Sequence, residues 1–255
     1  MDRLIYSALA GISETNHPRF QLNNEIANVL TAGFKRSFVN ASQTVKISGD
    51  GFDTRFSPTS VSRDQISLHS GPLMFTGNNS DIAMNGHTVL GVSNSKGELA
   101  FTRRGDLRVN NSGALETGNG QVVRGQNGPI SIPPGYAISF TADGSVFAQQ
   151  GSEGVATPPV FVGRLMLRDA SQVKLHRSSD GLFETFAAAE GGERDITNGK
   201  YPASITPKTV EGSNVSPYEA MVRLIEMNRM FESHIKMIKE AKSIDESGAS
   251  MMKAS

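Results

Sequence analysis

A chain of 255 residues is long enough for one large domain or two ordinary ones. Its 25 basic and 25 acidic residues balance, so no net charge attracts it to nucleic acid or to an anionic membrane surface. The absence of cysteine excludes disulfides, thiolate catalysis and cysteine-based zinc sites, and no apolar run approaches the roughly 18 residues of a membrane span.

The N-terminal residues predict a helix with one apolar stripe that packs on other helices. Pro18 interrupts the pattern, because proline lacks an amide donor and disfavours helix at the preceding residue, so we expect a kink or a break near His17. Gly33 stands where a helix commonly ends at a glycine. The stripe recurs at alternating three- and four-residue steps at Ile5, Ala8, Ile12 and Thr15, and the same register continues at Leu22, Ile26 and Val29.

The first residues superficially resemble a secretory signal, because Arg3 precedes an apolar stretch with an Ala-x-Ala pattern at Ala8 to Ala10. The apolar part before that pattern is about four residues long, against the ~7–15 of a signal-peptide core, and Asp2 cancels the charge of Arg3. We therefore interpret this segment as the start of a mature helix and expect export, if it occurs, without a cleaved signal of this kind.

Residues 37–67 predict a connector. The segment is rich in Ser and Thr, lacks a clean period, and contains Gly49-Asp50-Gly51 and Pro58.

The middle of the chain, from about Leu68 to Ser204, has short β-favouring runs separated by turn dipeptides. Four runs predict strands: Thr88–Val92, Glu98–Thr102, Tyr136–Thr141 and Val160–Leu167. Several of the dipeptides between the runs are preferred in hairpins, which favours a mostly antiparallel β domain. The dipeptides are Asn85-Gly86, Lys96-Gly97, Ser112-Gly113, Asn119-Gly120, Pro134-Gly135, Asp143-Gly144 and Asp180-Gly181.

The C-terminal residues predict a second helix with an explicit start. Ser216 is a capping residue, Pro217 suits the first helical position, and Glu219 lies three residues after the cap. Past Ser243 the periodic pattern fades. The apolar stripe of this helix consists of Met221, Leu224, Phe231, Ile235 and Ile238.

Together these elements predict an α+β protein whose N- and C-terminal helices pair as a coiled-coil-like stalk. We divide the chain into an N-terminal helical assembly segment (1–36), the connector (37–67), a β-rich outer domain (68–208) and a C-terminal helical assembly segment (209–255). Two helices that pack only on each other are marginally stable, so neighbouring subunits must cover the rest of their apolar surface. The residues expected at subunit interfaces are Ile5, Ile12, Leu22, Ile26, Val29, Met221, Leu224, Phe231, Ile235 and Ile238.

A search for catalytic or ligand-binding patterns nominates no site. The five histidines are scattered without metal-ligand spacing, and the segment from Gly192 to Lys200 lacks the P-loop spacing. Asp106 and Asp143 stand next to turn glycines, where aspartate serves turn geometry. We therefore expect no enzyme activity, cofactor or metal.

Two further features have a structural interpretation. Arg103 and Arg104 could make a basic contact, but we interpret them as lying on opposite faces of a strand. The methionines of the C-terminal helix favour adaptable packing over a ligand pocket.

One long motif resembles the signature of the flagellar basal-body rod and hook family. It is Asn23-Asn24-Glu25-Ile26-Ala27-Asn28-Val29-Leu30-Thr31-Ala32-Gly33-Phe34-Lys35, which is similar to Asn-Asn-x-Leu/Ile-Ala-Asn-Val-x-Thr-x-Gly-Phe-Lys. The segments from Thr76 to Gly86 and from Phe101 to Leu107 resemble β-domain patterns of the same family. Glu211-Gly212-Ser213-Asn214-Val215 resembles the entry to the terminal helix. Within the family, the opening Met1 to Tyr6 is most similar to that of proximal-rod members.

The resemblance implies a structural subunit that is exported through the flagellar type III apparatus. It implies assembly with itself and with other rod proteins into the drive shaft that crosses the periplasm, with the terminal helices around the export channel and the β domain outside. It implies neither nucleic-acid binding nor membrane insertion. Copy number, helical symmetry and the identity of the neighbours are not contained in the sequence.

Two alternatives remain open at this point. The chain could be a distal-rod or hook-related subunit of the same class. It could instead be a monomeric β-rich module that binds glycans, which predicts exposed aromatic platforms, whereas the chain has no Trp and four Tyr.

Overall fold

The computed structural model describes residues 2–38, 43–49, 52–59, 65–150, 158–189, 191–197 and 199–253. The chain divides into two compact units. Unit 1 consists of residues 1–27, 39–63 and 216–255, and unit 2 consists of residues 28–38 and 64–215. Each unit therefore contains segments from both halves of the sequence.

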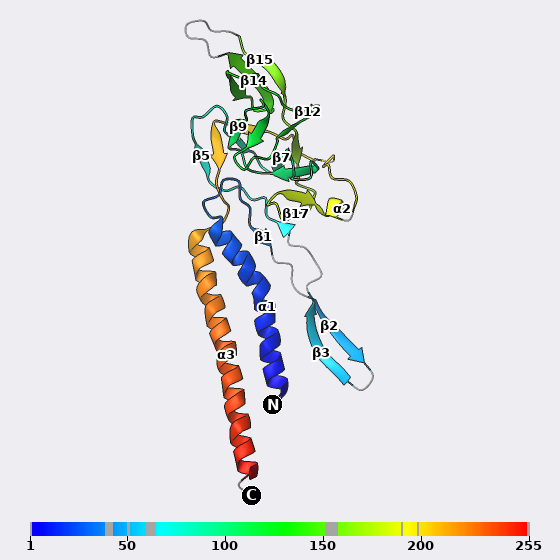
Figure 1. Cartoon of the computed structure of the whole chain (residues 1–255), viewed down its shortest axis with the longest axis vertical. Helices are drawn as coiled ribbons and strands as arrows, with labels where there is room; N and C mark the ends of the chain where they lie inside the picture. Colours follow the sequence, from blue (N-terminus) through cyan, green and yellow to red (C-terminus); the bar gives the residue numbers. More distant parts are fainter. Residues whose placement is uncertain are drawn as a thin grey trace. The chain divides into compact units, whose positions relative to one another are not determined.

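Unit 1 contains two long helices, α1 (Asp2–Ala27) and α3 (Pro217–Lys253), and the hairpin of β2 (Gln43–Gly49) and β3 (Phe52–Thr59). The helices lie side by side and run in opposite directions (Figure 1). Gly11 of α1 faces the ring of His234, and the guanidinium of Arg19 lies 5.6 Å from the ring centroid of Phe231. The small surface of Gly11 lets the two helices approach closely at that point.

The predicted start of α3 is confirmed. The helix begins at Pro217, the amide of Glu219 lies 3.4 Å from the hydroxyl of Ser216, and the amide of Ala220 donates to the Ser216 carbonyl. A serine cap and a proline at the first helical position both supply what a helix N-terminus lacks.

Unit 2 is built from short strands and one short helix, α2 (Phe186–Ala189). The strands are β1 (Ser37–Phe38), β4 (Gln65–Ile66), β5 (Leu73–Phe75), β6 (Ile82–Met84), β7 (Thr88–Ser93), β8 (Leu99–Thr102), β9 (Leu107–Val109), β10 (Leu115–Thr117), β11 (Arg124–Gly125), β12 (Gly128–Pro129), β13 (Tyr136–Phe140), β14 (Ser145–Gln150), β15 (Val160–Arg164), β16 (Leu167–Asp169), β17 (Leu175–Arg177), β18 (Phe183–Thr185), β19 (Ile205–Pro207) and β20 (Thr209–Glu211).

The strand pairs of unit 2 are antiparallel throughout its described residues. The largest sheet has the order β1-β4-β17-β18-β8-β7-β16, and a three-stranded sheet has the order β13-β14-β15. Two-stranded pairs complete the unit: β9 with β10, β11 with β12, β6 with β19, and β5 with β20. The expected α+β class with mostly antiparallel strands is therefore confirmed.

Two hydrophobic clusters form the core of unit 2. The larger contains Ile82, Leu90, Leu115, Val146 and Leu165, and each of these side chains is fully buried. The smaller gathers around Phe101 and Phe183, which also pair across β8 and β18.

All seven glycines of the predicted turn dipeptides have positive φ angles, between 52° and 85°, which favour glycine because it lacks a Cβ atom.

Several predictions of local structure need correction. Helix α1 continues through Pro18, so no break occurs near His17, whereas the alternative of a kink there stays a prediction. It ends at Ala27, so Val29 follows the helix and Gly33 lies well beyond its end. Helix α1 also contacts α3, and tertiary packing of this kind overrides local propensity.

The run predicted as one strand from Val160 to Leu167 is two strands in different sheets. The chain leaves β15 at Arg164, where the amide of Leu165 bonds to Gly144 and that of Met166 bonds to Arg124. It then joins the large sheet as β16. A continuous β-favouring run does not reveal such a change of partner.

The segment expected to be a connector, residues 37–67, contains four strands. β1 and β4 pair at the edge of the large sheet, and β2 and β3 form their own hairpin. The Ser and Thr residues of this segment obscured the weak alternation at Val45 and Ile47 and at Phe52, Thr54 and Phe56.

Candidate functional site

The end of the long motif, at residues 33–35, lies against the motif at residues 211–215 inside unit 2. The amide of Gly33 donates to the carbonyl of Glu211 (2.7 Å), and the amide of Asn214 donates to the carbonyl of Phe34 (3.3 Å). The next amide, that of Gly212, donates to the carbonyl of Pro72 (2.8 Å). Residues 28–36 and 209–215, which the sequence pattern places in helical segments, both belong to unit 2.

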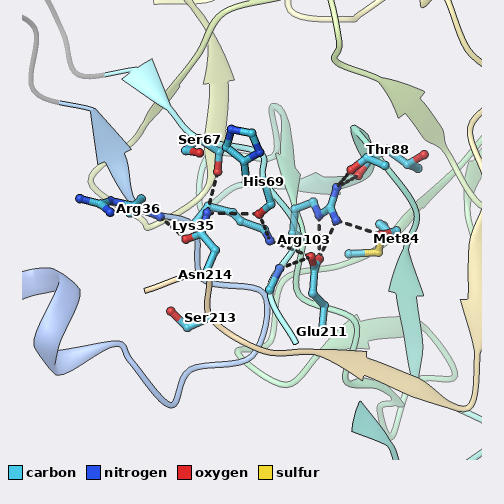
Figure 2. A network of polar contacts seen from close by, with 12 residues as sticks. Lys35, Arg36, Ser67, His69, Met84, Thr88, Arg103, Glu211, Ser213 and Asn214 are labelled. Atoms are coloured by element: carbon cyan, nitrogen blue, oxygen red, sulfur yellow. Dashed lines mark hydrogen bonds and ion pairs between the residues drawn. The ribbon is translucent and has the colours of Figure 1, made fainter. Parts of the chain in front are cut away.

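Glu211 forms the centre of a buried ionic network (Figure 2). One carboxylate oxygen lies 2.7 Å from Nζ of Lys35 and also accepts the amide of Gly71 at 3.0 Å. The other oxygen accepts Nε of Arg103 at 2.8 Å and lies 2.7 Å from its Nη2. The side chains of all three charged residues are 0% exposed. We call Lys35, Arg103 and Glu211 the ionic triad.

The guanidinium of Arg103 also satisfies the turn between β6 and β7. Its Nη1 donates to the carbonyls of Gly86 (2.5 Å) and Thr88 (3.1 Å), and its Nη2 donates to that of Met84 (2.9 Å). Every nitrogen of this side chain therefore has an acceptor, as a buried guanidinium requires.

Asn214 extends the network toward the edge of the large sheet. Its side-chain oxygen accepts the amide of Arg36 (2.7 Å), and its side-chain nitrogen donates to the carbonyls of Ser67 (3.1 Å) and His69 (3.2 Å). Nζ of Lys35 donates to the same carbonyl of His69 (2.9 Å). Figure 2 shows that these residues come from three separate parts of the chain.

Two glycines leave the space that the network occupies. Gly33 has a φ of +69°, and a Cβ atom there would lie 2.3 Å from the carbonyl oxygen of Arg103. A Cβ at Gly71 would lie 2.3 Å from the carbonyl oxygen of Gly212. The main chains therefore pack against one another without side chains between them, which glycine alone allows.

The ionic triad holds two cations and one carboxylate. Burial lowers the pKa of Lys35 to about 8, and the charge of Arg103 acts in the same direction, whereas the hydrogen bond to Glu211 opposes the shift. Desolvation disfavours a charged lysine, which explains the direction.

This shift predicts a pH dependence of stability. The pKa of Lys35 is lower in the folded chain than in the unfolded chain. The free-energy cost of burying the charged lysine is therefore fully present below pH 8 and is relieved as the pH rises toward 10.5. We expect the free energy of unfolding of the wild type, relative to Lys35→Met, to rise by up to about 3 kcal/mol across this window. Urea unfolding of both proteins from pH 7 to 10.5 measures it, and a constant difference contradicts the assignment.

The geometry suits the triad for holding the fold together rather than for chemistry on a substrate. Its charged atoms are enclosed, and a substrate could not reach them without unfolding of the strand that carries Glu211. Within the described ranges, no group of three or more His, Asp or Glu residues is arranged to hold a metal ion.

The residues proposed for subunit interfaces lie mostly in unit 1. Leu22 is buried, whereas Met221 is 58% exposed. Val29 lies outside the helix, and the side chain of Ile5 lies outside the described part of the structure. The half-buried members are Ile12, Ile26, Leu224, Phe231, Ile235 and Ile238.

The motif residues divide between the units. Asn23, Asn24 and Ala27 are exposed on α1, while Thr31 donates its hydroxyl to the side chain of Asn28 (3.1 Å). The remaining motif residues pack inside unit 2, and they are Gly33, Phe34, Glu211, Gly212, Ser213, Asn214 and Val215.

Helix α3 keeps apolar surface beyond what α1 contacts. A hollow of about 320 Å³ is lined by Phe231 and Ile235 with Glu232, Lys236 and Lys239 at its rim. The exposed apolar side chains along this helix are Tyr218, Met221, Val222, Ile225, Met230, Met237, Ile244 and Met251. Solvent-exposed apolar residues in such number indicate an interaction surface.

The buried role of Arg103 is not evident from the sequence. Arg103 and Arg104 follow the end of β8 at Thr102, so the prediction that they lie on opposite faces of a strand is wrong. Arg104 is half-buried and pairs with Asp106 at 2.6 Å. Burial of Arg103 depends on a carboxylate 108 positions later, so a single sequence held no signal for it beyond a charged residue next to an apolar run.

Comparison with known families gives two matches. Residues 83–148 match the model described as flagellar hook protein FlgE/F/G D1 domain, and residues 206–251 match the model described as flagellar basal body rod FlgEFG protein C-terminal. The second match includes Glu211 and the whole of the capped start of α3.

Individual relatives match over nearly the full length. The chain is 34% identical to the flagellar basal-body rod protein FlgF of Salmonella typhimurium strain LT2, over 96% of the chain and 95% of that protein. It is 31% identical to FlgF of Escherichia coli K12, over 93% of each. It is 28% identical to the rod protein FlgG of Buchnera aphidicola subsp. Baizongia pistaciae, over 86% of the chain and 87% of that protein. Over the described residues, neither long helix is apolar enough to cross a membrane.

Proposed function

The chain belongs to the flagellar basal-body rod protein family, and from this premise we propose that it is a structural subunit of the rod that assembles through its terminal helices. The family is structural rather than enzymatic. The observation that carries the mode of assembly is the apolar surface that α3 leaves uncovered beside α1. A helix of this kind gains stability by packing against helices of neighbouring subunits.

In this proposal α1 and α3 pair as a coiled-coil-like stalk and line the export channel, while unit 2 faces outward. The partners are other rod proteins and further copies of the chain, and the subunit reaches the rod through the flagellar type III apparatus. The location is the basal body, in the part of the rod that crosses the periplasm.

A position in the proximal rod is supported by the opening Met1 to Tyr6 and by higher identity to the two FlgF proteins than to the FlgG protein. The alternative within the same class is a distal-rod or hook-related subunit. Quantitative mass spectrometry of purified basal bodies separates the two, because a few copies per rod support the proximal position and a high copy number supports the distal one. Membership of the rod family favours both a proximal-rod and a distal-rod or hook-related subunit over a glycan-binding module.

The variant Ile235→Asp tests assembly through α3. Ile235 lines the hollow on this helix, and a charge placed in an apolar helix interface is costly to desolvate. We expect at least a tenfold loss of the subunit from basal bodies and loss of motility, while unit 2 keeps its wild-type urea midpoint.

The matched control is Ser243→Asp, which places the same charge on an exposed position of the same helix. This control should assemble at close to the wild-type level. Normal incorporation of Ile235→Asp, or equal loss of both variants, contradicts assembly through the face that carries Ile235.

A further inference from the structure

The last segment of unit 2 to be synthesised is an internal part of its structure. Residues 209–215 form β20 and the turn that leads out of the unit. Thr209, Val210, Glu211, Ser213 and Val215 are each between 1% and 7% exposed. A segment that is buried in this way cannot be added to a unit whose surface has already closed over the same space.

The charges of the ionic triad make the order of synthesis matter. Lys35 and Arg103 precede Glu211 by 176 and 108 positions, and both are fully buried in the folded unit. Among the described residues that come before position 209, each has backbone carbonyls as partners but no carboxylate within salt-bridge distance. Burying two cations without a counter-ion costs a large share of the stability of a small domain.

Backbone hydrogen bonds of unit 2 also depend on residues 209–215. Until β20 is present, β5 has no strand partner, and the amides of Gly33 and Arg36 have no acceptor in Glu211 and Asn214. Gly33 is buried, so its unpaired amide would add to the cost of early closure.

We propose that Glu211 acts as a late folding checkpoint: unit 2 closes only after residues 209–215 are available to neutralise Lys35 and Arg103. A chain that emerges from its N-terminus therefore keeps this part of unit 2 open until residues 209–215 have emerged. The inference does not rest on the proposed function, although an open chain suits the export proposed above.

The experiment measures folding on the ribosome with a force-sensitive arrest peptide. The chain is stalled at increasing lengths, and the fraction that escapes arrest reports the folding force at each length. We expect the main rise in force when residues 209–215 have left the ribosomal tunnel. A full-height rise while position 208 or an earlier residue is the last one outside overturns the proposal.

A variant then tests the charge. Glu211→Gln keeps the shape of the side chain and removes its charge, and we expect the force peak at the same length to fall at least twofold. Glu116→Gln is the matched control, because Glu116 pairs with the largely exposed Arg108 in a surface ion pair. This control should leave the peak unchanged. A peak of wild-type height in Glu211→Gln, or an equal fall in both variants, overturns the role of the Glu211 charge.

Discussion

Replacing Arg103 with leucine is expected to lower the free energy of unfolding by about 3–5 kcal/mol, the cost of breaking a buried ion pair by removing one partner. Glu211 keeps Lys35 but loses two close contacts to the guanidinium. The carbonyls of Met84, Gly86 and Thr88 lose a donor as well. Urea unfolding of the full chain, followed by circular dichroism, measures the effect.

The neighbouring residue supplies the control for this prediction. Arg104 makes a two-point contact with Asp106, with distances of 2.6 and 2.7 Å, but its side chain is 22% exposed and that of Asp106 is 33% exposed. Partly exposed pairs contribute about 0–1 kcal/mol, so Arg104→Leu should cost at most about 1 kcal/mol. Equal losses in both variants would show that burial of the triad does not determine its contribution.

The variant Gly33→Ala is expected to destabilise unit 2 by about 3 kcal/mol or more. A left-handed backbone costs a residue with a Cβ atom about 1–2 kcal/mol. The new Cβ would also lie 2.3 Å from the carbonyl oxygen of Arg103, and relieving such overpacking costs about 1–3 kcal/mol. To relieve the overlap, the backbone at position 33 must move away from Arg103. This movement separates the amide at position 33 from the carbonyl of Glu211 and displaces β20, which carries the carboxylate of the ionic triad.

Gly120 separates the two contributions. It has a φ of +84°, but a Cβ atom there would meet no heavy atom within 4 Å. Gly120→Ala should therefore cost about 1–2 kcal/mol, from backbone strain alone. The measurement is again urea unfolding, and a loss in Gly33→Ala no larger than that in Gly120→Ala would contradict close packing at Gly33.

The features that could be predicted from the sequence are local. The cap at Ser216 and Pro217, the seven turn glycines, and the strands at Thr88, Leu99 and Tyr136 each depend on a few adjacent residues. The α+β class follows from them, because their periodicities differ between the ends and the middle of the chain. The long motif ending in Lys35 carried the family resemblance, and the comparisons confirmed it.

The tertiary structure decided what the motif residues do. The sequence pattern places Gly33, Phe34 and Glu211 in helical assembly segments, yet they pack inside unit 2. The sequence predicts that Arg103 and Arg104 lie on opposite faces of a strand, yet Arg103 follows the end of β8 and its side chain is fully buried. In the same way, the division of Val160–Leu167 between two sheets depends on partners at Gly144 and Arg124.

The physical reason lies in the distance along the chain over which each interaction acts. Helix caps, turn conformations and the alternation of a strand are determined by neighbours within a few residues, so the sequence by itself determined them. The ionic triad joins residues 108 and 176 positions apart, and each charge is tolerated in the core only because the others are there. No local pattern records such a pairing, and only the folded chain decides which carboxylate meets Lys35 and Arg103.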